Sequence, residues 1–247
     1  MRTPAAIATA AAPSARAAAV APASPWSSAQ ARASDRADKR QAVLRTAAKL
    51  FNEKGFHATS LDEVAEQLKV TKPTLYYYVK NKDEILFDCV HAGLDMVRAG
   101  VAQAGRSGGT ALDKLRACMH AYAEVVTQDF GMCVIRVGED PLPIEGRRKL
   151  RQLKAQIDLE FRKLIELGIA EGSLEPCDSK LAAFMLAGAL SWIGRWYRPD
   201  GELSSDVLAK QCISLLLNGV VRRADASPAT KDPVAVGKPA RARKAMR

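Results

Sequence analysis

Two short helical patterns with a three-residue turn between them constrain this chain more than any other feature. The segment SLDEVAEQL, residues 60–68, carries apolar residues at the spacing of one helix face. Ser60 followed by Glu63 is a capping-box signature of a helix start. After the turn, Thr71 is a natural N-cap, and Pro73 falls in a first helical turn, where its missing N–H costs nothing. The segment is therefore expected to contain two consecutive short helices.

This arrangement predicts a helix-turn-helix motif over about 60–79, whose second helix enters the major groove of DNA. Each helical residue advances by about 100°. Leu75 and Val79 therefore share one face, which must pack on the preceding helices. Tyr77 then points away from that face. The alternative is an amphipathic helix with an aromatic surface, but the cap, the turn length and the proline together favour DNA binding.

The outward face of the second helix is expected to meet base edges, and its flanks to meet phosphates. Pro73 and the Thr74 methyl group suit thymine methyl groups, and Lys72 suits the acceptors of guanine. Lys82 stands at the start of the next helix, where a cation and helix N–H groups attract a phosphate. The expected DNA-contacting residues on this basis are Lys72, Pro73, Thr74, Tyr76, Tyr77, Tyr78 and Lys82.

Helical spacing continues along the chain, and no segment sustains the period-two alternation of a strand. A break is expected around FGMCVIRVGEDPLP, residues 130–143. The pattern predicts an all-α fold of about nine helices: an N-terminal three-helix unit with the helix-turn-helix, followed by further helices in the C-terminal half. Helical segments are expected at about 44–54, 60–68, 72–79, 83–101, 112–126, 144–170, 179–197 and 205–221.

Composition and charge narrow the classes of partner. The formal net charge is +10 and the isoelectric point about 9.5, which favours a polyanion such as DNA. The five cysteines are scattered without a CxxC pair, which favours reduced thiols in the cytoplasm. His57, His91 and His120 form no HExxH motif and are assigned no acidic partner at metal spacing, so neither a metal nor a cofactor is expected. The sequence shows no nucleophile–base set and no phosphate-binding loop, and so gives no indication of an enzyme.

Both ends of the chain are expected to be disordered tails. Residues 1–36 are rich in Ala, Pro and Ser and loosely resemble a targeting peptide, but prolines interrupt any continuous apolar region. Residues 224–247 are rich in Pro, Lys and Arg, with little apolar content. Between them we expect a DNA-binding domain at 37–97 and a second helical domain at 98–223.

The stretch from about Lys39 to Leu94, which contains AVLRTAAKLFNEKGFHATSLDEVAEQLKVTKPTLYYYVKNKDEIL, resembles the DNA-binding domain of the TetR family of transcriptional regulators. Two positions depart from the family pattern: Val79, where most members carry Phe, and Asp62, an acid near a position that reads bases in some members. The resemblance implies base contacts from Lys72, Pro73, Thr74 and Tyr77, and phosphate contacts from Ser60, Tyr76, Tyr78 and Lys82.

The resemblance also implies that residues 98–223 form an all-helical effector-binding and dimerisation domain, which binds a small ligand and dimerises through its last two helices. LSWIGRWYRPDGELS, residues 190–204, resembles a subgroup of which some members respond to acyl-CoA thioesters. Arginines there suit phosphates or a carboxylate, and tryptophans suit an apolar cavity. Alternatively, these residues form the dimer seam and satisfy carbonyls at a helix end. The candidate effector residues are Arg136, Trp192, Arg195, Trp196 and Arg198.

The sequence thus predicts a cytoplasmic, nucleoid-associated, homodimeric repressor that binds a palindromic operator and is released by a small molecule such as an acyl-CoA or a hydrophobic acid. Ligand binding would move the fourth helix, about 83–101. Glu139 and Asp140 are assigned to loop solvation. The competing functions are a non-specific architectural DNA-binding protein and an all-α enzyme that acts on the bound ligand. No membrane partner is expected.

Overall fold

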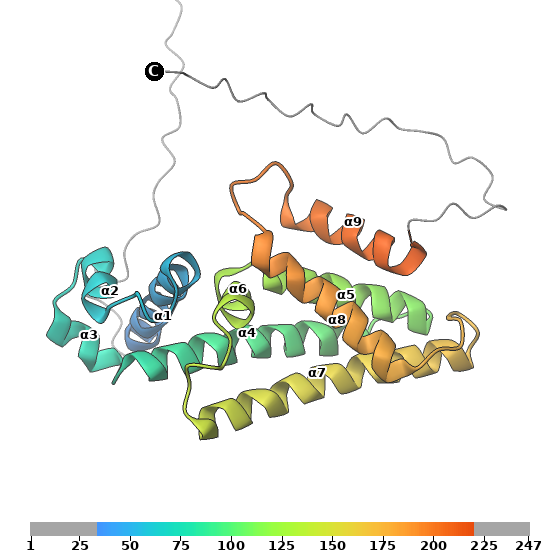
Figure 1. The fold of residues 1–247 in the computed structure, drawn as a ribbon, viewed down its shortest axis with the longest axis horizontal. Helices are drawn as coiled ribbons and strands as arrows, with labels where there is room; N and C mark the ends of the chain where they lie inside the picture. Colours follow the sequence, from blue (N-terminus) through green and yellow to red (C-terminus); the bar gives the residue numbers. More distant parts are fainter. Residues whose placement is uncertain (1–33, 220–247) are drawn as a thin grey trace, which may run out of the picture.

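The computed structural model describes residues 34–219, and every regular element in that range is an α-helix (Figure 1). This confirms the predicted all-α class for the described part of the chain. Its total agrees with the predicted number of about nine helices, although bounds were predicted for only eight of them. The two tails lie outside it, except that the first helix already includes residues 34–36. The elements are α1 (Ser34–Lys54), α2 (Leu61–Leu68), α3 (Lys72–Tyr78), α4 (Lys82–Gly105), α5 (Ala111–Val126), α6 (Asp129–Arg136), α7 (Ile144–Ala170), α8 (Ser179–Trp196) and α9 (Ser205–Asn218).

Local signals in the sequence set the ends of α2 and α3. The Ser60 hydroxyl accepts a hydrogen bond from Glu63 N, and the Glu63 carboxylate accepts one from Ser60 N, as the capping box predicted. Lys69 ends α2 in the left-handed conformation at φ 55°. The Thr71 hydroxyl then accepts from the N–H of Thr74 and starts α3. The two helices therefore form the predicted helix-turn-helix.

Helix α4 connects the two halves of the molecule. Its first turns bury Ile85, Leu86 and Cys89 beside α1, and its later turns pack on α5, α6 and α7. Figure 1 shows α4 running from the α1–α3 unit into the C-terminal helices. The boundary expected between residues 97 and 98 falls inside this helix. The buried apolar residues of both halves form one contiguous core cluster.

Helix α6 lies inside the segment that was expected to be a break. Only residues 137–143 of that segment are non-helical, so the prediction was wrong for residues 130–136. The helix is short, and its packing depends on glycine. A Cβ on Gly131 would lie 1.9 Å from the carbonyl oxygen of Val125, and one on Gly93 of α4 would lie 2.6 Å from that of Phe130. Helix α6 is therefore wedged between α4 and the end of α5, at distances that only glycine permits.

Helix α8 leaves a broad apolar face exposed to solvent in a single chain. Leu181, Phe184, Met185 and Trp192 on this helix are all exposed. Gly188 was expected to permit a close helix approach, and a Cβ added to it would meet no described atom within 4 Å. Such a face suits the predicted dimer contact. Among residues 34–219, no helix combines the length and apolar content that crossing a membrane requires.

Candidate DNA-binding and effector sites

Helix α3 separates a packing face from a solvent face. Leu75 and Val79 are buried, at 0% and 2% exposure, as the helical wheel predicted. Tyr77 is 63% exposed and Tyr76 46% exposed. Tyr78 is half-buried and packs on the core, with its ring edge-on to that of Tyr77 at 5.1 Å between centroids. The three tyrosines therefore point in different directions, and two of them present much of their surface outward.

Asp62 of α2 forms an ion pair with Lys72 at the start of α3. The Lys72 ammonium lies 2.8 Å from the Asp62 carboxylate, and this hydrogen bond raises the pKa of Lys72. Both side chains are more than half exposed, so solvent screens the pair. Beside them, the hydroxyls of Thr71 and Thr74 are 2.8 Å apart. Asp62, the departure from the family pattern, thus contacts Lys72 on the exposed surface.

Lys82 has a structural contact that the sequence did not predict. Its ammonium donates to the carbonyl oxygens of Phe56 (2.9 Å) and Thr59 (3.0 Å) and lies 4.4 Å from the centre of the Phe56 ring. It forms no ion pair with a carboxylate of the described residues. Its hydrogen bonds hold the loop between α1 and α2, while its positive charge stays unneutralised at the N-terminus of α4.

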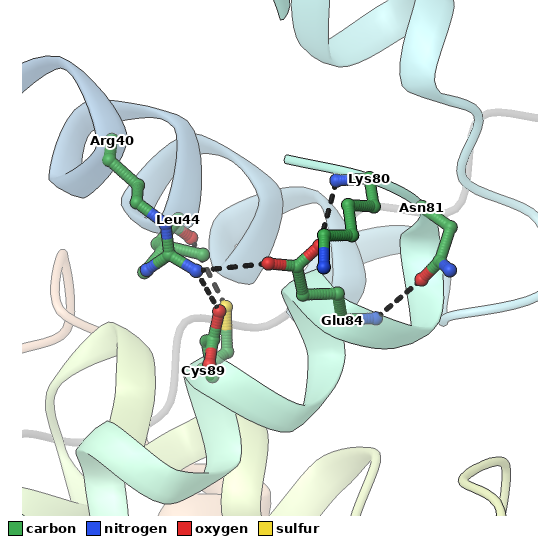
Figure 2. Close-up of polar contacts among 7 residues, drawn as sticks. Arg40, Leu44, Lys80, Asn81, Glu84 and Cys89 are labelled. Carbon is green, nitrogen blue, oxygen red and sulfur yellow. Dashed lines mark hydrogen bonds and ion pairs between the residues drawn. The ribbon is translucent and has the colours of Figure 1, made fainter. Parts of the chain in front are cut away.

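Helices α1 and α4 are clamped together by a polar cluster (Figure 2). Arg40 of α1 donates to Glu84 at 3.3 Å and to Asp88, both on α4. Burial alone would lower the pKa of Arg40, but the two carboxylates outweigh it and raise that pKa. The Cys89 thiol donates to the carbonyl oxygen of Leu44 at 3.3 Å. The first two turns of α4 are therefore fastened to the DNA-binding unit.

A cleft of about 510 Å³ lies between the end of α1 and the ends of α6 and α8. Asn52 of α1 connects these parts, because its amide donates to the carbonyl oxygen of Asp129 at the start of α6, at 2.8 Å. The amide oxygen of Asn52 is buried and has no hydrogen-bond partner among residues 34–219. No sequence signal pointed to Asn52, since its partner is far away in the chain. The cleft is lined by Phe51, Asn52, Gly55, Arg136, Arg195, Trp196, Tyr197, Arg198, Pro199 and Asp200.

Two of the cleft arginines cap helix ends. Arg136 donates through Nε to the carbonyl oxygen of Gly194 and through Nη2 to that of Tyr197, both at 2.9 Å. Arg195 donates to the carbonyl oxygen of Arg136 at 3.3 Å. These contacts are the alternative that the sequence left open, in which arginines satisfy terminal carbonyls. They also fix two guanidinium groups at the wall of the cleft.

The three arginines of the cleft form a cluster of positive charge. Burial, and then the charges of Arg195 and Arg198, lower the pKa of Arg136. Neither Arg136, Arg195 nor Arg198 forms an ion pair within the part of the chain that the structure describes. Trp196 lines the same cleft, whereas Trp192 lies outside it and is 63% exposed. Four of the five candidate effector residues are therefore brought together.

The histidine and loop assignments need correction. Two histidines do have acidic neighbours at helical spacing: His91 lies 3.0 Å from Asp95, and His120 lies 3.6 Å from Glu124. Glu139 is not a solvated loop residue, because it is 9% exposed and pairs with Arg151 at 2.9 Å and with Lys154. The sequence could not show this pairing, since it depends on how the loop before α7 folds back on that helix.

Comparisons with known proteins cover both halves of the chain. The family model "Bacterial regulatory proteins, tetR family" matches residues 43–89, and the model "Tetracyclin repressor-like, C-terminal domain" matches residues 108–220. The HTH-type transcriptional repressor KstR2 of Mycolicibacterium smegmatis is 25% identical over 195 residues, which cover 75% of this chain and 92% of that protein.

Solved structures agree with these matches. PfmR, a TetR family transcriptional regulator from Thermus thermophilus, matches with a TM-score of 0.67 and 30% sequence identity. The match covers 73% of this chain and 99% of the PfmR chain. AibR, solved with isovaleryl coenzyme A and operator DNA, matches with a TM-score of 0.65 and 26% sequence identity. The match covers 72% of this chain and 97% of the AibR chain.

Proposed function

Because this chain belongs to the TetR family of bacterial regulatory proteins, and is a DNA-binding transcriptional regulator, we propose that it is a homodimeric repressor released by a coenzyme A thioester. Such a regulator would act in the cytoplasm, on the nucleoid. Its relatives in the family are regulators rather than enzymes, and we propose that it has no catalytic role. Two surfaces carry this proposal: the exposed face of α3 and the arginine cleft.

The exposed face of α3 supports sequence-specific DNA binding. Pro73 and Tyr77 lie on the side opposite the buried Leu75, Thr74 lies beside them, and Lys72 is exposed in the first turn. All four would meet base edges. Phosphates would be bound at the flanks and at the start of α4, by Ser60, Tyr76, Tyr78 and Lys82. Lys82 would act through its unneutralised charge, since its ammonium already donates to backbone carbonyls. The Asp62 carboxylate would restrict the direction in which the Lys72 ammonium points, and so would limit the bases to which Lys72 can donate.

The arginine cleft is the observation that supports a coenzyme A thioester. Three guanidinium groups without a carboxylate partner in the described chain suit the phosphates of a nucleotide-like ligand, because arginine forms paired hydrogen bonds with phosphate oxygens. Trp196 would pack on an apolar or aromatic part of the ligand. Trp192 would contribute from the dimer face instead. AibR, a protein of similar fold, was solved with isovaleryl coenzyme A.

The position of the cleft would couple ligand binding to DNA binding. Its walls come from α1 of the DNA-binding unit and from α6 and α8 of the effector half. A ligand that fills the cleft would alter the α1–α6 contact made by Asn52. Because Arg40 clamps α1 to α4, the DNA-binding unit and the first turns of α4 would then tilt together. The separation of the two α3 helices in the dimer would change, and the operator would be released.

Selection of bound duplexes from a random DNA pool tests both halves of the proposal. We expect one palindromic site, and we expect its recovery to fall when acyl-CoAs are added but not when the free acids are added. Free coenzyme A serves as the control for the contribution of the phosphates alone. Binding without any preferred site would instead support an architectural DNA-binding protein, and conversion of the added thioester would support an enzyme.

A further inference from the structure

Three side chains of types that can bind metal ions lie close together on two helices, outside the cleft and outside α3. His120 and Glu124 are one turn apart on α5, and Asp206 lies in the first turn of α9. His120 Nε2 is 3.0 Å from Asp206 Oδ1, and His120 Nδ1 is 3.6 Å from Glu124 Oε2. With one ligand atom taken from each residue, the three atoms lie within 4.8 Å of one another. We propose that His120, Glu124 and Asp206 form a binding site for a divalent transition-metal ion such as Zn²⁺.

The geometry fits one small ion. Zinc binds nitrogen and carboxylate oxygen at about 2.0–2.2 Å, so ligand atoms of one tetrahedral ion stand somewhat more than about 3 Å apart. The two short distances involve different ring nitrogens of His120, and one ion takes only one of them. With one atom from each residue, the three ligand atoms lie within 4.8 Å of one another, so side-chain rotations must bring them closer to bind one ion. One imidazole nitrogen and two carboxylate oxygens leave a fourth position for water. Imidazole favours zinc, copper and nickel over magnesium and calcium.

The surroundings leave these groups available to an ion. His120 is 29% exposed, and Glu124 and Asp206 are each 48% exposed, so solvent reaches all three. Glu124 makes no other side-chain polar contact within the described residues. Lys210 lies 2.7 Å from Asp206 Oδ2 and so fixes the carboxylate with Oδ1 toward His120.

An ion at this position would fasten α9 to α5. Helix α9 rests on α5 through Leu208, Ala209 and Ile213, which are buried, while its outer face is exposed. Asp206 is the group at its N-terminus that reaches α5. Bound metal would therefore stabilise the docking of the last helix, independently of DNA and of the arginine cleft.

Metal titration of the full chain tests the site, with Co²⁺ as a spectroscopic substitute for Zn²⁺. We expect one ion per chain, a visible absorption band of Co²⁺ in a nitrogen–oxygen site, and a higher melting temperature with Zn²⁺. Glu124→Gln and Asp206→Asn are each expected to weaken binding by at least about tenfold. Glu124→Gln is the cleaner variant, because its side chain is exposed and supports no other contact in the described chain.

Two matched variants serve as controls. His91→Ala removes a histidine that has one carboxylate neighbour, Asp95, and no second one among the described residues, so metal affinity should not change. Cys177→Ser removes the exposed thiol, and should also leave the affinity unchanged. The proposal is overturned if Co²⁺ and Zn²⁺ do not bind, if Glu124→Gln binds as tightly as the unaltered chain, or if Cys177→Ser abolishes binding.

Discussion

The α2–α3 motif and the arginine cleft both present exposed polar residues, but they are assembled in different ways. In the motif, each contact that fixes the backbone joins residues within a few positions, such as Ser60 with Glu63 and Thr71 with Thr74. In the cleft, Arg136 contacts Gly194 and Tyr197, and Asn52 contacts Asp129. A surface built from local contacts can be predicted from the sequence. One built from distant contacts becomes visible only in the fold.

The largest expected effect concerns the close packing of α6 at Gly131, in the effector half. Gly131→Ala should lower the free energy of unfolding by about 3 kcal/mol, because the new Cβ would lie 1.9 Å from the carbonyl oxygen of Val125. Urea denaturation measures this. Gly105→Ala is the control, since its Cβ would meet no described atom within 4 Å and the change should be neutral or add up to about 1 kcal/mol. Equal behaviour of the two variants would show that α6 does not depend on close packing.

The next effect tests the local surface. Tyr77→Ala should weaken operator binding by about 2 kcal/mol, roughly thirtyfold, because it removes a base contact from the exposed face of α3. Its free energy of unfolding should change by less than about 0.5 kcal/mol. Fluorescence anisotropy with a labelled operator measures the affinity. Leu75→Ala, on the buried face, should instead lose stability, and a Tyr77→Ala variant that unfolds would contradict the assignment of the two faces.

A smaller effect is expected in the cleft. Arg198→Gln should weaken the affinity for an acyl-CoA by about tenfold, or about 1.4 kcal/mol, and leave operator binding unchanged. Arg198 suits this test because, unlike Arg136 and Arg195, its side chain caps no helix in the described chain. Isothermal titration calorimetry measures the affinity. Unchanged acyl-CoA binding in this variant would remove the phosphate role from the cleft.

The smallest effect concerns the buried carboxylate in the loop between α6 and α7. Burial would raise the pKa of Glu139, but hydrogen bonds from Lys154 and Arg151 outweigh it and lower that pKa. A lowered pKa in the folded state means that the stabilisation is present above the unfolded value of about 4.3 and is lost as the pH falls through the folded-state pKa. Glu139→Gln should cost roughly 1 kcal/mol at pH 7, and the difference from the unaltered chain should shrink in acid.

Urea denaturation across a pH series measures this difference. Asp140→Asn is the matched control, because Asp140 is exposed and forms no ion pair among the described residues. A cost for Glu139→Gln that stays constant into acid would mean that its charge is not what holds the loop.

Much of the fold could be predicted because helix starts, stops and apolar faces repeat along the chain. The long helix Ile144–Ala170 was placed correctly from apolar spacing. Helix α6 was missed because eight residues give little more than two turns of periodicity, and because its interior Gly131 favours a break when packing is unknown. The close approach of α4 and α6 at Gly93 likewise becomes visible only once the two helices are seen together.

For the polar residues too, local features could be predicted from the sequence and distant contacts could not. The direction of each tyrosine on α3 followed from helix geometry, since the buried Leu75 and Val79 fix the rotation of the helix. The contacts of Lys82 with Phe56 and Thr59, and the pairing of His120 with Asp206, join parts of the chain that no local pattern relates. Their residue types were visible in the sequence, whereas their partners were not.

The continuity of α4 has a consequence for anyone who exchanges modules between regulators. The DNA-binding unit and the effector half share this helix, so a chimera must be joined within it rather than in a loop. A single residue added or removed at the junction would rotate one half by about 100° and shift it by about 1.5 Å relative to the other. Hybrid regulators built on this chain should therefore preserve the residue count of α4 between Asp88, which pairs with Arg40, and the glycine contact at Gly93.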